Sequence, residues 1–148
     1  MTVTVRAVAA DDRAAWGRLY AGYADFYRVS QTPEMRDTVW GWLHDGAAQS
    51  EGVVAEDADG KVIGIAHFRP FARPLSASTG GFLDDLFVDP DCRGSGAAEM
   101  MIRHIGDLGR ARGWTVIRWI TADDNYRARA VYDRLSERTK WVTYDLKL

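Results

Sequence analysis

The sequence lacks most of the features that mark several common classes of protein. It contains a single cysteine, Cys92, which cannot form an internal disulfide or a metal cluster. It has no run of basic residues, and its formal net charge of −2 offers no positive face to nucleic acid. It also has no signal peptide, no long apolar segment and no internal repeat. We therefore expect a cytoplasmic protein with no metal site and no nucleic-acid or membrane partner.

What the chain does have is enough apolar sequence for one core. With 148 residues, of which 47% are hydrophobic, we expect a single domain that spans residues 1–148. Apolar residues at three- and four-residue spacing predict helices, and alternating or continuous apolar runs predict strands. In chain order we expect a strand at 3–7, helices at 11–28 and 33–43, a hairpin of strands 53–56 and 61–68, a loop at 69–81, a strand at 82–88, a helix at 98–112, a strand at 115–121, a helix at 125–135 and a strand at 141–148.

This order of elements predicts an α/β (α+β) fold. The order is strand, helix, helix, strand, strand, strand, helix, strand, helix, strand, which is typical of a mixed, mostly antiparallel central sheet with helices on both faces. Proline and glycine, at Pro70, Pro74, Gly80 and Gly81, are the reason for expecting a loop at 69–81.

Residues 82–99 are the most informative stretch of the chain. An apolar strand ends at Pro90, a glycine-rich turn follows, and an amphipathic helix opens directly behind the turn. The first N–H groups of a helix have no partner within it, and the helix dipole places partial positive charge at the same end. Gly94 and Gly96 have no Cβ, so a phosphate can approach the backbone, and Arg93 adds a charged side chain. The stretch therefore predicts an anion site.

Two familiar phosphate-binding loops do not fit this turn. The P-loop requires Lys and then Ser or Thr after its last glycine, where this chain has Ala97 and Ala98. The dinucleotide fingerprint requires Gly or Ala where this chain has Glu99.

The pattern Arg93-x-x-Gly96-x-Ala98 resembles the coenzyme A loop of the GCN5-related N-acetyltransferase (GNAT) superfamily. Two further matches support the resemblance, which extends over nearly the whole chain: the strand before the loop ends in Phe87-Val88-Asp89-Pro90, and Asn125, Ala128 and Tyr132 repeat the family's downstream Asn-x-x-Ala-x-x-x-Tyr motif. The family has the same order of elements.

The resemblance implies acetyl-CoA in a cleft between the strands at 83–88 and 115–121, which separate in this family. It also implies that a backbone N–H of Phe87 or Leu86 polarises the thioester and that Tyr132 protonates the departing thiolate. The residues implied in cofactor binding are Leu86, Phe87, Val88, Arg93, Gly94, Ser95, Gly96, Ala97, Ala98, Asn125 and Tyr132. Cys92 precedes the loop, so we do not expect an acyl-enzyme.

Asp84 and Asp85 are adjacent acids within an apolar strand, so their side chains should point to opposite faces. A buried carboxylate is costly unless it is paired, which makes these acids candidates for a catalytic role. The alternative is that one pairs with an arginine such as Arg118 and the other is solvated. An acidic pair stands at this place in polyamine acetyltransferases of the family, so we expect Asp84 to hold and deprotonate an amine.

The acceptor implied by the resemblance is a small primary amine or polyamine, bound near Tyr23, Tyr27 and His67. Among the other aromatic residues, we expect Phe26 and Trp40 to be core. Two further possibilities are an acetyltransferase acting on protein lysines or N-termini, and a catalytically silent module that binds coenzyme A. Residues 135–138 in place of the usual Leu-Gly-Phe, together with Asp84 and Asp85, resemble the histone and polyamine branch of the family. The exposed apolar strand expected at 141–148 favours a homodimer.

Overall fold

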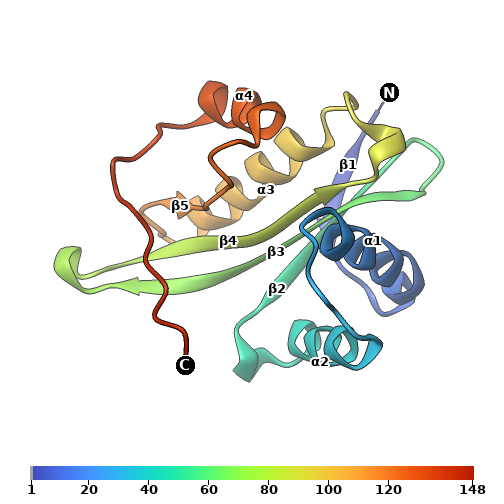
Figure 1. The fold of residues 1–148 in the computed structure, drawn as a ribbon, viewed down its shortest axis with the longest axis horizontal. Helices are drawn as coiled ribbons and strands as arrows, with labels where there is room; N and C mark the ends of the chain where they lie inside the picture. The colour runs from blue at the N-terminus through green and yellow to red at the C-terminus, as the bar shows by residue number, and fades with distance from the viewer. Residues whose placement is uncertain (1) are drawn as a thin grey trace.

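The computed structural model describes residues 2–148 as a curved sheet with helices on both faces (Figure 1). The elements follow the predicted order up to the last helix. They are β1 (Thr4–Ala7), α1 (Arg13–Phe26), α2 (Pro33–His44), β2 (Glu51–Glu56), β3 (Val62–Arg73), β4 (Ser78–Val88), α3 (Ala97–Ala111), β5 (Ile117–Arg118) and α4 (Tyr126–Leu135).

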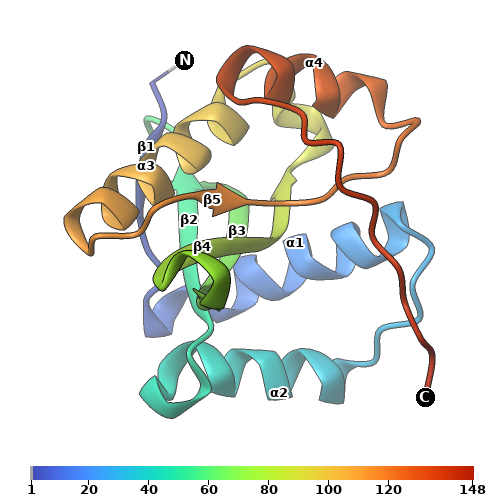
Figure 2. The same ribbon diagram turned by 90° about the vertical axis from the view of Figure 1, so that its left-hand side faces the viewer.

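The sheet has five strands in the order β1-β2-β3-β4-β5. The first four strands are antiparallel to their neighbours, and β5 runs parallel to β4. Helices α1 and α2 cover one face, whereas α3 covers the other and α4 lies beside it (Figure 2). The predicted α/β fold with a mostly antiparallel sheet is therefore confirmed. No helix among residues 2–148 is both long enough and apolar enough to cross a bilayer.

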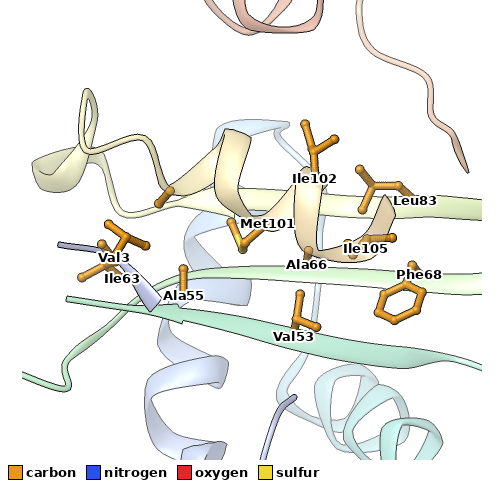
Figure 3. Packing of buried hydrophobic residues seen from close by; sticks show 11 residues of the cluster. Val3, Val53, Ala55, Ile63, Ala66, Phe68, Leu83, Met101, Ile102 and Ile105 are labelled. Atoms are coloured by element: carbon orange, nitrogen blue, oxygen red, sulfur yellow. The ribbon is translucent and has the colours of Figure 1, made fainter. Parts of the chain in front are cut away.

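Each face of the sheet has its own hydrophobic core, because successive side chains of a strand point to opposite faces. On the α3 side, Ile63, Ala66 and Phe68 of β3 pack against Met101 and Ile105 of the helix (Figure 3). The other face supports α1 and α2, and its buried residues are Trp16, Leu19, Tyr20, Trp40, Val54, Val62, Ile65 and Phe87. Trp40 is a core residue, as predicted.

The loop predicted at 69–81 is wrong, because β3 and β4 continue through it as a long hairpin. Pro70 pairs with Gly81, whose N–H points away from β3 and donates to Val116 at 2.9 Å. At this pair the Pro70 nitrogen likewise points away from β4, toward the side of β3 where β2 pairs. Because β2 pairs with β3 only as far as Phe68, the N–H that proline lacks would have had no strand partner. Gly81 is required for close packing, since a Cβ there would lie 2.5 Å from the Trp114 ring.

The strand predicted at 141–148 is also wrong. Residues 136–148 have no regular structure, and their apolar side chains point into solvent, with Trp141 86%, Tyr144 90% and Leu146 88% exposed. The strand predicted at 115–121 is reduced to the two residues of β5, and Ile120 is 65% exposed. A strand needs a hydrogen-bonded neighbour, and within residues 2–148 nothing pairs with the outer edge of β5.

Candidate active site

A cavity of about 530 Å³ opens where β4 and β5 separate. The ladder between the two strands joins only Gly81 to Ile117 and Phe82 to Arg118. Beyond these two pairs, β4 continues to Val88 paired with β3 but no longer with β5, and the chain after β5 leads away to α4 (Figure 2). The cavity is enclosed by the end of β4, the glycine turn and one face of α4, and it is lined by every residue predicted to bind the cofactor: Leu86, Phe87, Val88, Arg93, Gly94, Ser95, Gly96, Ala97, Ala98, Asn125 and Tyr132.

The glycine turn leaves the N-terminus of α3 open to this cavity. Gly94 and Gly96 both have positive φ, at +83° and +84°, and a Cβ on either would meet no protein atom within 4 Å. Gly96 is the N-cap residue and brings no side chain to the free N–H groups, although Ser95 Oγ accepts weakly from the Ala97 N–H at 3.3 Å. The remaining N–H groups and the helix dipole point into the cavity, which suits a phosphate.

Three arginines surround the cavity, and sequence reasoning found only Arg93. Its guanidinium lies 5.8 Å from the ring centroid of Phe26, which is 52% exposed and so not the core residue we predicted. Arg127 and Arg134 come from α4, and Arg134 also contacts Glu99 of α3 at 3.2 Å. Their seven-residue spacing places them on one face of the helix, which is the signal that could have identified them.

Tyr132 and Asn125 hold the α4 side of the cavity. The Asn125 side chain caps α4 by accepting from the Ala128 N–H at 3.5 Å. The Tyr132 ring packs edge-on against Trp119 at 5.4 Å between centroids, and no hydrogen-bond partner for its hydroxyl is found in the described part of the chain. Burial and the nearby Tyr27 raise the pKa of Tyr132 to about 12, so its phenol is protonated at neutral pH.

Asp84 and Asp85 have different surroundings because β4 has a bulge at this point in its pairing with β3. His67 pairs with Asp85 while Phe68 pairs with Leu83, which leaves Asp84 as the extra residue. The Asp84 side chain is 34% exposed and accepts from Arg69 Nε at 3.0 Å. Burial raises the pKa of Asp84 above its usual value, and Arg69 only partly opposes this effect.

Asp85 points to the α1 side and is held within a hydrogen-bond network. Its Oδ2 contacts His67 Nδ1 at 2.8 Å and accepts from the Tyr20 hydroxyl at 3.0 Å. Burial would raise the pKa of Asp85, but the hydrogen bonds from His67 and Tyr20 lower it overall. The alternative, that one acid pairs with an arginine and the other is solvated, is therefore right in its first half and wrong in its second. The arginine is Arg69, whereas Arg118 lies 5.4 Å from the ring centroid of Phe71.

Of the residues predicted to bind the acceptor, Tyr27 lines the cavity, whereas Tyr23, His67 and Asp84 lie behind or beside its wall. Tyr23 packs between Tyr27 and Phe87 with ring centroids 4.9 and 5.9 Å away. His67 is 4% exposed and touches Asp85, so it stands behind this wall. Within residues 2–148, no group of three or more His, Cys, Asp or Glu side chains is arranged to hold a metal ion.

Comparison with known proteins agrees with this geometry. The sequence pattern of the Acetyltransferase (GNAT) family matches residues 16–136. The chain is 25% identical over 143 residues to a D-amino-acid N-acetyltransferase of Saccharomyces cerevisiae, covering 96% of this chain and 89% of that protein. It is 26% identical over 149 residues to the N-acetyltransferase YhfO of Bacillus subtilis, covering 99% and 98% of the two chains.

Solved structures share the fold. The crystal structure of a ribosomal-protein-alanine N-acetyltransferase from Brucella melitensis biovar Abortus 2308 superposes with a TM-score of 0.82 at 21% identity, covering 100% of both chains. The match of the family pattern extends over most of this chain and includes the glycine turn, the end of β4 and the Tyr132 motif. The chain therefore belongs to the acetyltransferase (GNAT) family and is an N-acetyltransferase.

Proposed function

We propose that the protein transfers the acetyl group of acetyl-CoA to a primary amine, either a small amine or a polyamine, by direct attack within a ternary complex. One observation carries the proposal: a single cavity has an open helix N-terminus at one end and the protonated hydroxyl of Tyr132 in its wall. Acetyl-CoA is the cosubstrate of the family, and its pyrophosphate matches the chemistry of the turn at 93–98.

The arginines at the rim of the cavity suit the phosphate groups of the cofactor. Arg93 and Arg127 have no salt-bridge partner within residues 2–148, so both guanidiniums are available to phosphate oxygens. The apolar side chains at the end of β4, namely Leu86 and Val88, would pack along the uncharged arm that carries the thioester.

The backbone of β4 offers a donor for the thioester carbonyl. The Asp89 N–H donates to Ile63 of β3 at 2.8 Å, and N–H direction alternates along a strand. The N–H groups of Leu86 and Val88 therefore point to the opposite edge, where β5 has moved away and left them free. Of the two donors predicted from the resemblance, this geometry favours Leu86 over Phe87. A fixed backbone dipole at this position would stabilise the oxyanion as the amine attacks.

Two protons must move during the transfer. A new C–N bond forms as the C–S bond breaks, so the attacking ammonium loses one proton and the leaving thiolate gains another. Asp84 is our candidate for accepting the first proton, directly or through water, because 34% of its side chain remains exposed while partial burial raises its pKa above the usual value. Tyr132 is our candidate for donating the second.

The acceptor is proposed to be cationic because Tyr27 lines the cavity and Asp85 directly precedes the lining residue Leu86 in β4. Asp85 supplies negative charge, and Tyr23 and Tyr27 supply ring faces for cation–π contact. The place of the acids before the turn supports the polyamine branch. The relative from Saccharomyces cerevisiae is named for D-amino acids, so these belong among the acceptors to be tested.

A homodimer in the cytoplasm is part of the proposal. The apolar residues of the exposed tail, 136–148, alternate as in a strand, and the outer edge of β5 is unpaired within residues 2–148. Both features would be removed from solvent if the tail of one subunit paired with the sheet of the other. The single cysteine is compatible with a reducing compartment.

The test is a turnover screen of amines with acetyl-CoA, read by the release of free thiol. Diamines and polyamines should be acetylated faster than D-amino acids, lysine peptides or peptide N-termini. Preferential turnover of a peptide, or of a neutral hydroxyl compound, would contradict the proposed acceptor. Absence of turnover with every acceptor, in a protein that binds coenzyme A by calorimetry, would contradict the proposed reaction.

A further inference from the structure

A buried chain of hydrogen bonds connects α1 to Asp85, and the reaction proposed above does not use all of it. Trp16 Nε1 of α1 lies 2.8 Å from His67 Nε2 of β3, and His67 Nδ1 lies 2.8 Å from Asp85 Oδ2 of β4. Tyr20 completes the arrangement by donating to the same oxygen at 3.0 Å. Trp16 and His67 are only 2% and 4% exposed, so water does not substitute for these contacts.

The direction of each hydrogen bond follows from the chemistry of indole. An indole N–H is a donor only, so His67 Nε2 must accept and cannot carry a proton while Trp16 faces it. The single proton of the neutral imidazole must then reside on Nδ1, where it is donated to Asp85. The contact with Trp16 therefore fixes the tautomer of the neutral His67 ring.

This arrangement excludes a role for His67 in moving protons. A histidine beside a carboxylate can act as a relay only if its second nitrogen can release or accept a proton. Here that nitrogen is occupied by Trp16, and the residue beyond it is an indole that has no proton to exchange at neutral pH. A proton taken up by Asp85 would have no exit through His67.

What the network can do is hold a negative charge in place. Asp85 Oδ2 receives hydrogen bonds from His67 and Tyr20, and a hydrogen bond from the Tyr23 hydroxyl also helps to lower the pKa of Asp85. The Asp85 side chain keeps 21% of its surface exposed, so part of the carboxylate remains reachable. Burial, with the charge of Asp85, raises the pKa of Tyr20, which therefore stays a donor across the physiological range.

Resting on the proposed function, we infer that Trp16 and His67 are positioning residues that keep Asp85 as a fixed anion for binding the acceptor's ammonium group. Asp85 then selects cationic acceptors, and the neighbouring Asp84 takes the proton. The two adjacent acids have separate tasks because one is locked by donors on the α1 side while the other is exposed beside Arg69. Tyr23 is the remaining titratable group that faces Asp85, and burial keeps it protonated as well.

The first measurement does not depend on turnover. Nitrogen-15 NMR of the wild-type protein at pH 8, where histidine side chains are ordinarily neutral, should show His67 as the Nδ1–H tautomer. An Nε2–H tautomer would overturn the proposed network whatever the acceptor is.

The second measurement removes the lock. Trp16→Phe keeps an aromatic ring but removes the indole donor, so the Nδ1–H tautomer that donates to Asp85 is no longer enforced. The KM for a diamine such as putrescine at pH 8 should then rise about tenfold, with a smaller change in kcat. Adding His67→Gln to Trp16→Phe should raise the KM no further, because the indole acts through His67. A wild-type KM in a folded Trp16→Phe variant would overturn the positioning role.

Controls separate this inference from the proposed function and from loss of fold. Trp42 is 48% exposed on α2, so Trp42→Phe should leave the KM unchanged. Asp85→Asn serves if Trp16→Phe does not fold: it should raise the KM for putrescine by about 10- to 100-fold and leave coenzyme A affinity intact. A wild-type KM in a folded Asp85→Asn variant would overturn the role of Asp85 as an anion, whereas failure of wild-type protein to acetylate any amine would refute the proposed function alone.

Discussion

Replacement of Gly96 by alanine tests whether the turn at 93–98 binds phosphate. Gly96 has a φ of +84°, where an L residue is strained by about 1–2 kcal/mol. A Cβ there would meet no protein atom within 4 Å and would extend into the cavity at the N-terminus of α3. If a phosphate approaches this backbone, the methyl group should displace it and weaken at least one charge-assisted hydrogen bond.

The expected loss can be stated as an affinity. A hydrogen bond to a charged group contributes about 1.5–3 kcal/mol, so the Kd for coenzyme A should increase by about 10- to 100-fold. The backbone strain should also lower the melting temperature, by roughly 2–4 °C for each kcal/mol in a domain of this size. Titration calorimetry with coenzyme A and a thermal melt followed by circular dichroism measure the two effects separately.

Gly113 provides a matched control for this variant. It has a φ of +77°, a Cβ there would also meet nothing within 4 Å, and it follows the other end of α3, away from the cavity. Gly113→Ala should therefore lower the melting temperature by a similar amount while changing the Kd by less than about twofold. Equal coenzyme A affinity in Gly96→Ala, Gly113→Ala and wild type, or in a folded Gly96→Trp variant, would refute phosphate binding at the turn.

Other predictions concern catalysis and assembly. Tyr132→Phe should lower turnover by about 10²- to 10⁴-fold with coenzyme A affinity nearly intact, and a loss of less than about threefold would assign the proton to another group. Because burial raises the pKa of Tyr132 to about 12, the loss of wild-type activity caused by its ionisation should begin well above pH 10, and a tyrosine titration near pH 10 in the pH–rate profile would contradict this placement. Asp84→Asn should reduce activity most at low pH, where little free amine exists, with partial recovery at high pH, and an unchanged profile would exclude Asp84 as the base. Light scattering should show a dimer that becomes monomeric when residues 137–148 are deleted, whereas a monomer at micromolar concentration in the full chain would exclude the homodimer.

The residues predicted to bind the cofactor lie in one cavity, and their grouping could be predicted because the signals are local. The glycine turn, the helix behind it and the Asn125 to Tyr132 motif are each encoded within a few residues, and the fold brings all of them to one cavity. The first two helices and the order of the five strands followed from hydrophobic periodicity in the same way.

The parts that failed depend on partners distant in sequence. Nothing near Asp84 and Asp85 indicates that Arg69 pairs with the first or that Tyr20 and His67 hold the second. Proline and glycine at 69–81 predicted a loop because both residue types usually interrupt strands. Whether they do so depends on which edge of the sheet they face, and the sequence does not show this. The tail at 141–148 has the alternating apolar pattern of a strand, but the pattern does not show whether another strand lies next to it to form hydrogen bonds.

The short contact between β4 and β5 also bears on how the protein moves. The chain after β5 has few attachments to the rest of the molecule. They include the ladder of two residue pairs, the contact of Arg134 with Glu99, the hydrogen bond from Asn125 to Tyr27, and the packing of Trp119, Tyr132 and Leu135 on the α3-side core. Segments with few buried contacts open locally at a free energy below that of global unfolding. Amide hydrogens of α4 should therefore exchange earlier than those of α3 in the empty protein. A cosubstrate that spans the glycine turn and α4 would tie the two walls together, so the site becomes stiff only once it is loaded.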